Sequence, residues 1–403
     1  MRISLFHDTA GGSKRTLYEQ ARGLKSRGHK LDLYSFTNAP EGEWDVRSLA
    51  DWSFRVPLRV LPARWLSSSW WPPLPNLAIE LINYALVTRA CGQLAKMIHA
   101  REYDVAFTHQ CRFTHTPPLL TQLRIPTVHF CQEPSRRFFE AINSDLDDEP
   151  LVRDWWPQRR PGLALLANLE RRCLVAATQL LVNSQYSREF LAHVYSLPAS
   201  VCYLGVDPGR FRPMGDPRES LVLSVGALAR VKGHGFVVRA LSRLPERRRP
   251  KLVVIADRGV QSLADGLREI ASRLRVDLDI RVGVSDEELV RWYGRASVVA
   301  CGQILEPFGL VALEAMACET PVVAVREGGF RETIMEGQTG FLASRDPGEF
   351  AERLELILER DDLRARLGKA AREWVLERWT WEHAVSNLER YLYAAAGSAD
   401  RTS

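Results

Sequence analysis

Apolar residues follow two alternating patterns along the first half of the chain. Segments with apolar residues on one helical face, such as 16–27 and 76–100, separate short runs that are apolar at almost every position. These runs have the length of strands and occupy 2–7, 31–36, 104–108, 126–131 and 179–182. Strands of this kind are buried on both faces, so the alternation predicts a parallel sheet covered by helices on both sides.

The same alternation starts again near residue 220. Further strand-like runs occupy 220–226, 251–256, 297–300 and 321–325, and the segment 381–396 has a helical pattern. Glycines and prolines cluster at 205–218, between the two series. Because 403 residues suffice for two hydrophobic cores, we expect two doubly wound α/β domains joined at this cluster.

Composition narrows the class of protein. The net charge of +5 suits an anionic small molecule or membrane surface and does not call for nucleic acid. Seven scattered cysteines without a CxxC pair argue against a disulfide framework or a zinc site and fit a reducing cytosol. The first residues read as a buried strand rather than a signal peptide, and the most apolar stretch, 77–91, is interrupted by Glu80. We therefore expect a cytoplasmic protein.

Two glycine-containing turns follow predicted strands. The first contains Gly11 and Gly12 ahead of a helix, where backbone N–H groups can receive an anion; a plain tight turn is the alternative. The second runs from Gly226 past Arg230 to Lys232, whose ammonium group could neutralise a diphosphate; a surface lysine is the alternative. Neither turn is specific on its own.

The segment 306–332 carries the most specific pattern. Glu306 precedes a helix that we expect to begin near Gly309, where the N–H groups of Phe308, Gly309 and Leu310 favour a phosphate. Glu314 lies further along that helix and could accept two ribose hydroxyls. A solvated helix face is the alternative for either glutamate alone.

Together these strings resemble the EX7E element of retaining glycosyltransferases with the GT-B fold, the group 1 or family 4 class. Further similar stretches cover nearly the whole chain, at 27–29, 181–187, 204–213, 285–296 and 379–381. The resemblance implies two Rossmann-like domains facing a central cleft: an acceptor-binding domain at 1–205 and a donor-binding domain at 206–380. The segment 381–403 would supply a helix that returns to the N-terminal domain.

The resemblance also implies roles for individual residues. Glu314 would hold the ribose of a nucleotide-diphosphate sugar, Glu306 would lie against the donor sugar, and Lys232 would bind the diphosphate. Gly12 would close over the phosphates. The implied reaction transfers a hexosyl group, with retention and without a metal or other cofactor, to a hydroxyl of a glycan, a lipid-linked or a small-molecule acceptor. GDP-mannose, UDP-glucose and UDP-N-acetylglucosamine all remain candidate donors.

Three positions depart from the family pattern. Ala227 stands where an arginine usually follows Gly226, and the candidates to replace that arginine are Arg230, Arg326 and Arg331. Glu319 stands where glycine is usual, which costs about 1 kcal/mol if the backbone needs a positive φ.

The third departure concerns a histidine that many relatives carry at the end of the strand near 126. Here that position is Gln132, and His129 lies three residues earlier, on the opposite face of a strand. We expect His129 to be a core histidine and rank Gln132 above it as the polar contact to the donor, although both are candidate catalytic residues beside Glu306 and Lys232. His109 and His115 rank lower.

The acceptor side offers a tryptophan- and proline-rich stretch at 65–74, preceded by Arg55, Arg59 and Arg64. It could rest on the inner face of a membrane or hold a lipid-linked acceptor, but packing against the helix at 76–100 is the favoured reading. Ser135 with the two arginines that follow it, and the acidic run at 145–149, are expected to flank the mouth of the cleft. The rival functions are a nucleotide-sugar-binding protein without transfer activity and a sugar-nucleotide epimerase on the same scaffold.

Overall fold

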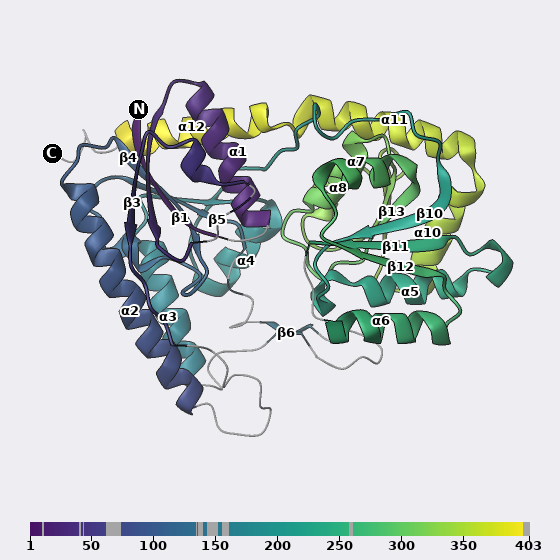
Figure 1. Cartoon of the computed structure of the whole chain (residues 1–403), viewed down its shortest axis with the longest axis horizontal. Helices are drawn as coiled ribbons and strands as arrows, with labels where there is room; N and C mark the ends of the chain where they lie inside the picture. Colours follow the sequence, from purple (N-terminus) through teal and green to yellow (C-terminus); the bar gives the residue numbers. More distant parts are fainter. Residues whose placement is uncertain are drawn as a thin grey trace. The chain divides into compact units, whose positions relative to one another are not determined.

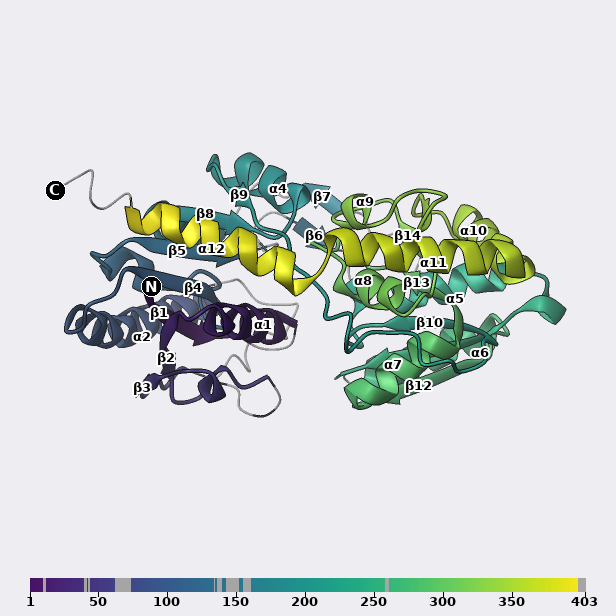
Figure 2. The same ribbon diagram turned by 90° about the horizontal axis from the view of Figure 1, so that it is seen from above.

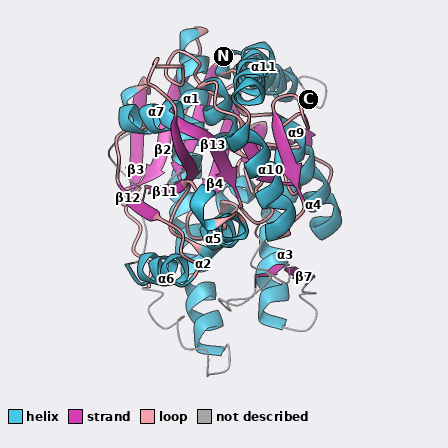
Figure 3. Cartoon of the chain, turned by 90° about the vertical axis from the view of Figure 1, so that its right-hand side faces the viewer, coloured by secondary structure: helices cyan, strands magenta, loops and turns pink. Residues whose placement is uncertain are grey.

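The computed structural model describes residues 1–9, 12–39, 42, 44–61, 74–133, 135, 140–142, 152–154, 161–257 and 261–397. The chain forms two compact units (Figure 1). The N-terminal unit comprises Met1–Ala141, Leu151–Tyr203 and Ala384–Ser403, and the C-terminal unit comprises Ile142–Pro150 and Leu204–His383. Each unit is built around its own parallel sheet with helices on both faces, as the alternating pattern predicts (Figure 3).

The N-terminal unit contains a seven-stranded sheet in the order β3-β2-β1-β4-β5-β8-β9. Its strands are β1 (Arg2–Asp8), β2 (Lys30–Phe36), β3 (Trp52–Val56), β4 (Val105–Cys111), β5 (Thr127–Cys131), β8 (Gln179–Val182) and β9 (Ser200–Val201). Its helices are α1 (Gly12–Ser26), α2 (Leu74–His99), α3 (Pro161–Val175) and α4 (Gln185–Tyr195), with short 3-10 turns at Val46–Ser48 and Pro118–Gln122. A separate two-stranded sheet pairs β6 (Glu140–Ile142) with β7 (Val152–Asp154).

The helix α2 covers one face of this sheet. Its residues Val87, Cys91 and Leu94 are fully buried in a cluster with Phe6 of β1 and Tyr34 of β2. The register places Ile3 of β1 beside Leu31 of β2, so the strands present matched apolar rows to the helices. All seven cysteines of the chain lie within the described residues, and each is a buried free thiol.

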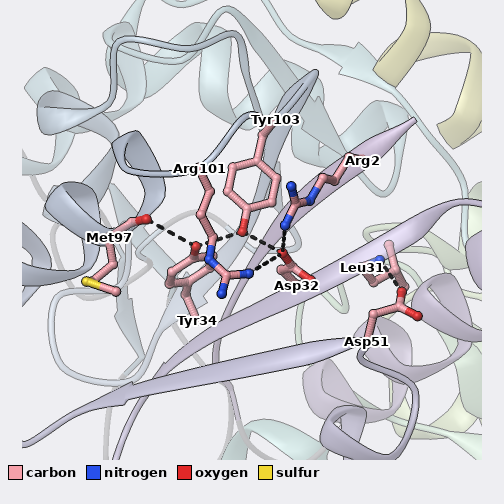
Figure 4. A network of polar contacts seen from close by, with 8 residues as sticks. All are labelled: Arg2, Leu31, Asp32, Tyr34, Asp51, Met97, Arg101 and Tyr103. Atoms are coloured by element: carbon pink, nitrogen blue, oxygen red, sulfur yellow. Dashed lines mark hydrogen bonds and ion pairs between the residues drawn. The ribbon is translucent and has the colours of Figure 1, made fainter.

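A charged network lies at the amino edge of the same sheet (Figure 4). One carboxylate oxygen of the buried Asp32 accepts hydrogen bonds from Arg2 at 2.8 Å, from Arg101 at 3.2 Å and from the hydroxyl of Tyr103 at 2.7 Å. A buried carboxylate needs such partners to remain charged. The network therefore joins the starts of β1 and β2 to the loop before β4, at the edge opposite the one where α/β sheets bind ligands.

The C-terminal unit contains a six-stranded sheet in the order β12-β11-β10-β13-β14-β15. Its strands are β10 (Glu219–Val225), β11 (Lys251–Ala256), β12 (Leu278–Val282), β13 (Ala296–Cys301), β14 (Val322–Val325) and β15 (Gly340–Ala343). Its helices are α5 (His234–Arg243), α6 (Gln261–Arg273), α7 (Asp286–Arg295), α8 (Leu310–Ala317), α9 (Phe330–Thr333), α10 (Pro347–Glu359) and α11 (Asp361–Arg378), with 3-10 turns at Arg230–Lys232 and Glu246–Arg248.

The last helix, α12 (Trp381–Gly397), belongs to the N-terminal unit from Ala384 onward, which confirms the predicted return of the chain (Figure 2). Glu389 accepts hydrogen bonds from Arg27 at 2.8 Å and pairs with the ring of His29 at 2.7 Å. A Cβ atom on Gly23 of α1 would lie 2.5 Å from the side chain of Val385, so a larger residue at this position would force Val385 to move. None of the described helices is long and apolar enough to cross a membrane.

Candidate functional site

Three loops of the C-terminal unit leave the carboxyl ends of the adjacent strands β10, β13 and β14. They carry Gly226 to Lys232, Glu306 to Gly309, and Gly328 with Gly329. The carboxyl edge is where open α/β sheets bind ligands. The structure therefore brings together residues from the two segments, 226–232 and 306–332, in which the sequence predicted donor contacts.

Lys232 and Glu306 form an ion pair between two of these loops. The Nζ atom of Lys232 lies 2.8 Å from Oε2 of Glu306, and both side chains are partly exposed. The backbone holds the same two loops together, because the N–H of Ile304 donates to the carbonyl of Val231 at 2.9 Å. The site thus contains a partly exposed cation next to a partly exposed carboxylate.

Backbone geometry fixes the position of Glu306 at the start of α8. Gly309 caps this helix with φ 96°, and the N–H of Gly329 donates to the carbonyl of Glu306 at 2.8 Å. Gly328 has φ 54°, and a Cβ atom there would lie 2.2 Å from the same carbonyl oxygen. Such an approach is open only to glycine. Phe308 is buried below the loop, and Leu310, half-buried, begins the helix.

Glu314 lies on α8 and is 95% shielded from solvent, since its relative exposure is 5%. One of its oxygens accepts a hydrogen bond from the hydroxyl of Tyr293 at 2.8 Å. Burial raises the pKa of Tyr293, and the negative charge of Glu314 raises it further. The tyrosine thus stays a neutral donor that orients the carboxylate, a role that the sequence did not suggest.

His234 was also missed, although it lies two residues after Lys232. Its Nδ1 atom lies 2.9 Å from Oγ of Ser224. Its Nε2 atom lies 3.3 Å from the carbonyl oxygens of Gly226 and Ala227. Burial lowers the pKa of His234 to about 4, so the ring is neutral at pH 7. Two carbonyl acceptors require the proton on Nε2, and the ring therefore ties the glycine turn to the end of β10.

The arginines that could replace the one missing at Ala227 differ in their surroundings. Arg326 donates to the carbonyl of Leu342 at 2.8 Å, and Arg331 donates to the carbonyl of Gly328 at 3.3 Å. Arg230 is exposed on the turn that carries Lys232. Arg230 therefore lies on one of the site loops and Arg331 lies on α9, directly after another, whereas the side chain of Arg326 is turned toward β15.

In the N-terminal unit, Gln132 and His129 lie on opposite faces of the sheet. Gln132 donates to the carbonyl of Ser13 at 3.3 Å and lies 3.1 Å from Nδ1 of His109, which stacks on Phe130. His129 is fully buried, with Nδ1 2.9 Å from the hydroxyl of Thr108, and burial lowers its pKa to about 3. Its Nε2 has no hydrogen-bond partner. The structure thus places Gln132 beside the first turn of α1, which begins at Gly12.

His115 belongs to a second polar cluster at the end of β4. Its Nδ1 lies 2.8 Å from the buried carboxylate of Glu170, which also accepts from Thr116 at 3.1 Å and from Tyr195 at 2.7 Å. The ring is partly exposed, and its backbone has φ 62°. Glu170 was not predicted, because nothing in the sequence connects it with a residue 55 positions away.

Some predicted features fall outside the described residues: Gly11, most of the tryptophan-rich stretch with Arg64, residues 136 and 137, and the acidic run at 145–149. Within the described part of the chain, no group of three or more His, Cys, Asp or Glu side chains could hold a metal ion.

Comparison with known proteins identifies the family. The model for glycosyltransferase family 4 matches residues 10–210, and the model for glycosyl transferases group 1 matches residues 210–374. A D-inositol 3-phosphate glycosyltransferase of Corynebacterium aurimucosum is 30% identical over 416 residues, which cover 97% of this chain and 92% of that protein. The chain belongs to the glycosyltransferases of group 1 and family 4.

Other proteins similar to this glycosyltransferase support the same family and fold. A D-inositol 3-phosphate glycosyltransferase of a Nocardioides species is 33% identical over 258 residues, an alignment that spans only about half of either protein, 56% of each. Sucrose-phosphate synthase of Thermosynechococcus elongatus has the same fold with a TM-score of 0.74 at 22% identity, over 98% of this chain and 99% of that one. HepE of Anabaena, solved with UDP and glucose, superposes with a TM-score of 0.69 at 19% identity, over 98% and 100%. The fold is therefore GT-B, as predicted.

Proposed function

We propose that this glycosyltransferase transfers a hexosyl group, with retention of configuration and without a metal, from a nucleoside-diphosphate sugar to an acceptor hydroxyl. The observation that carries the proposal is the pair formed by Lys232 and Glu306 in the loops that follow β10 and β13. A cation beside a carboxylate suits a substrate in which an anionic leaving group is joined to a polyhydroxylated sugar.

The donor would be bound by groups of the C-terminal unit. The Lys232 ammonium would neutralise charge on the diphosphate, and the N–H groups at the start of α8 would face a phosphate oxygen. Glu306 would accept hydrogen bonds from the sugar, and Glu314, oriented by Tyr293, would accept one from the ribose. The N-terminal unit would contribute Gln132 and the glycine turn before α1.

In the proposed step, the bond between the anomeric carbon and the diphosphate oxygen breaks, and its electron pair leaves with the diphosphate. The acceptor oxygen forms its bond to the same face of the anomeric carbon, and its proton passes to the departing phosphate oxygen. The described residues then act by positioning and by stabilising charge rather than as nucleophiles.

The relatives suggest substrates to test first. HepE was solved with UDP and glucose, and the curated relatives are named for D-inositol 3-phosphate. We therefore propose a small polyol phosphate as one candidate acceptor, alongside glycan and lipid-linked hydroxyls. The cytoplasmic location and a peripheral membrane contact through 65–74 remain predictions.

The test is release of nucleoside diphosphate from a panel of UDP-, GDP- and ADP-sugars, with and without inositol 3-phosphate. We expect Glu306→Ala to lower the rate by about 100-fold and Glu314→Ala to weaken binding of the nucleoside diphosphate by about 10-fold. Glu219→Ala, at the amino edge of the same sheet, serves as the matched control and should behave as wild type. No release by wild type, together with no loss in Glu306→Ala, would refute the proposal.

The same assay separates the rivals. A silent binding protein, favoured only by Ala227 and Gln132, would bind the nucleotide sugar and release nothing. An epimerase would convert the sugar without releasing nucleoside diphosphate. The anomeric configuration of the product, read by NMR, tests retention, and activity in EDTA tests independence from metals.

A further inference from the structure

Two charged side chains outside the predicted site meet where three loops of the C-terminal unit converge. Arg345 follows β15, and Glu327 precedes Gly328. The Nε atom of Arg345 donates to Oε1 of Glu327 at 2.8 Å, and its Nη2 donates to Oε2 at 2.5 Å. The pair is a two-point contact between side chains that are 14% and 24% exposed. Such partly desolvated, forked pairs hold geometry better than single surface contacts.

The remaining donors of Arg345 reach the loop that leads to Glu306. Its Nη1 donates to the carbonyl of Gly302 at 3.0 Å, and its Nη2 also donates to the carbonyl of Gln303 at 2.9 Å. One guanidinium group therefore binds both Glu327 and two successive carbonyls after β13. A lysine could not reproduce this fork, since its ammonium group acts as a point charge.

Glu327 binds the backbone of the same loop two residues further along, at Leu305. Its Oε2 accepts the N–H of Leu305 at 3.3 Å, and Leu305 has φ 46° although it is not glycine. A left-handed conformation costs a branched residue about 1–2 kcal/mol and persists only where its surroundings enforce it. Leu305 directly precedes Glu306, so its conformation sets the direction in which the Glu306 side chain leaves the backbone.

We infer that Arg345 and Glu327 are positioning residues that keep Leu305 in its strained conformation and thereby aim Glu306 at Lys232. The inference rests on the proposed function, because Glu306 matters only if it meets a donor. Neither residue of the pair is among the proposed donor contacts. They act through Glu306, and their removal should redirect that carboxylate while the sheet below remains intact.

A double-mutant cycle tests whether Glu327 acts through Glu306. In the assay of nucleoside diphosphate release, Glu327→Gln should lower the rate by about 10-fold or more when Glu306 is present. In the Glu306→Ala background the same change should lower it by less than about 3-fold, because the group through which it acts is already gone. Equal losses in both backgrounds would overturn the inference, since a general loss of stability would act on both alike.

A second measurement does not depend on any substrate. Acylation of lysines by an amine-reactive ester, followed by mass spectrometry, reports whether Lys232 is still paired with Glu306. We expect Glu306→Ala, Glu327→Gln and Arg345→Lys each to raise the acylation rate of Lys232 at least about 3-fold. The rate at Lys251, on the amino side of β11, should stay unchanged in all of them.

The matched control is Glu219→Gln, which removes a carboxylate paired with Arg295 at 2.6 Å in the same unit. It should leave both readouts at the wild-type value. If Lys232 becomes more reactive in Glu306→Ala but not in Glu327→Gln or Arg345→Lys, the positioning role is refuted. If wild type releases no nucleoside diphosphate while acylation responds as expected, the proposed function fails and the positioning role stands.

Discussion

At the scale of single residues, His234 makes the stability of the C-terminal unit depend on pH. The folded protein keeps its ring neutral down to about pH 4, whereas the unfolded chain protonates it near 6.5. Between these values the unfolded state binds more protons, so the free energy of unfolding falls as pH falls from about 6.5 to about 4. The contribution of this one group is about 3 kcal/mol at most.

The variant His234→Gln separates this titration from the hydrogen bonds. A glutamine amide can still donate to the carbonyls of Gly226 and Ala227, but it does not titrate. We expect urea denaturation at a series of pH values to show a smaller loss of stability for the variant between pH 7 and pH 4. Parallel pH curves for the two proteins would contradict the assignment.

Sequence predicted the site residues that belong to one continuous stretch and missed those that act across loops. Glu306 and Glu314 were predicted because they lie on one short segment, and Lys232 because it follows a glycine turn. Arg345 and Tyr293 were missed because their partners, Glu327 and Glu314, lie 18 and 21 positions away. Only the packing of separate loops shows that these side chains meet.

At the scale of the element, the end of α8 contains the strain expected from the sequence. Glu319 has φ 58°, and a Cβ atom on Gly368 of α11 would lie 2.1 Å from the Glu319 carbonyl oxygen. We expect Glu319→Gly to raise the free energy of unfolding by about 0.5–1 kcal/mol, since removal of the strain exceeds the entropy that glycine adds to the unfolded chain. Thermal or urea denaturation measures the gain.

Glu319→Ala is the control for this prediction. Alanine removes the carboxylate but keeps the Cβ atom, so it should give no comparable gain. A gain of equal size in both variants would mean that the side-chain charge, rather than the backbone, is the source of the strain.

Within the two main sheets, the strands that sequence analysis missed are the four at the edges, β3, β9, β12 and β15. All nine interior strands gave continuous apolar runs, because neighbours and helices bury both of their faces. The edge strand β3 alternates half-buried and exposed residues up to the buried Val56, and β12 has no buried residue. The strand β15 is buried, but it begins with glycine, so its apolar run has only three residues. Periodicity therefore identifies the interior of a sheet more readily than its borders.

At the scale of the whole molecule, membership of a unit does not follow the order of the sequence, because α12 completes the N-terminal unit. Glu389→Gln should weaken the contacts to Arg27 and His29 and lower the stability of that unit by about 1–2 kcal/mol. Hydrogen exchange followed by mass spectrometry should show faster exchange in α1 and β2. Peptides from β11, in the other unit, should be unaffected.

Glu377→Gln, an equal loss of charge on the exposed side of α11, provides the comparison. It should change exchange in neither α1 nor β2. Faster exchange spread over both units in Glu389→Gln, or no change in either, would contradict the assignment of α12 to the N-terminal unit.

The return of α12 also sets the order in which a newly made chain can finish folding. On the ribosome, roughly 180 residues are added between Tyr203 and Ala384, which takes about 10–40 s at common rates of synthesis. Throughout that interval the faces around Gly23 and His29 lack their partner helix and remain open to solvent or to chaperones. The half of the protein that is translated first is therefore the half that is completed last.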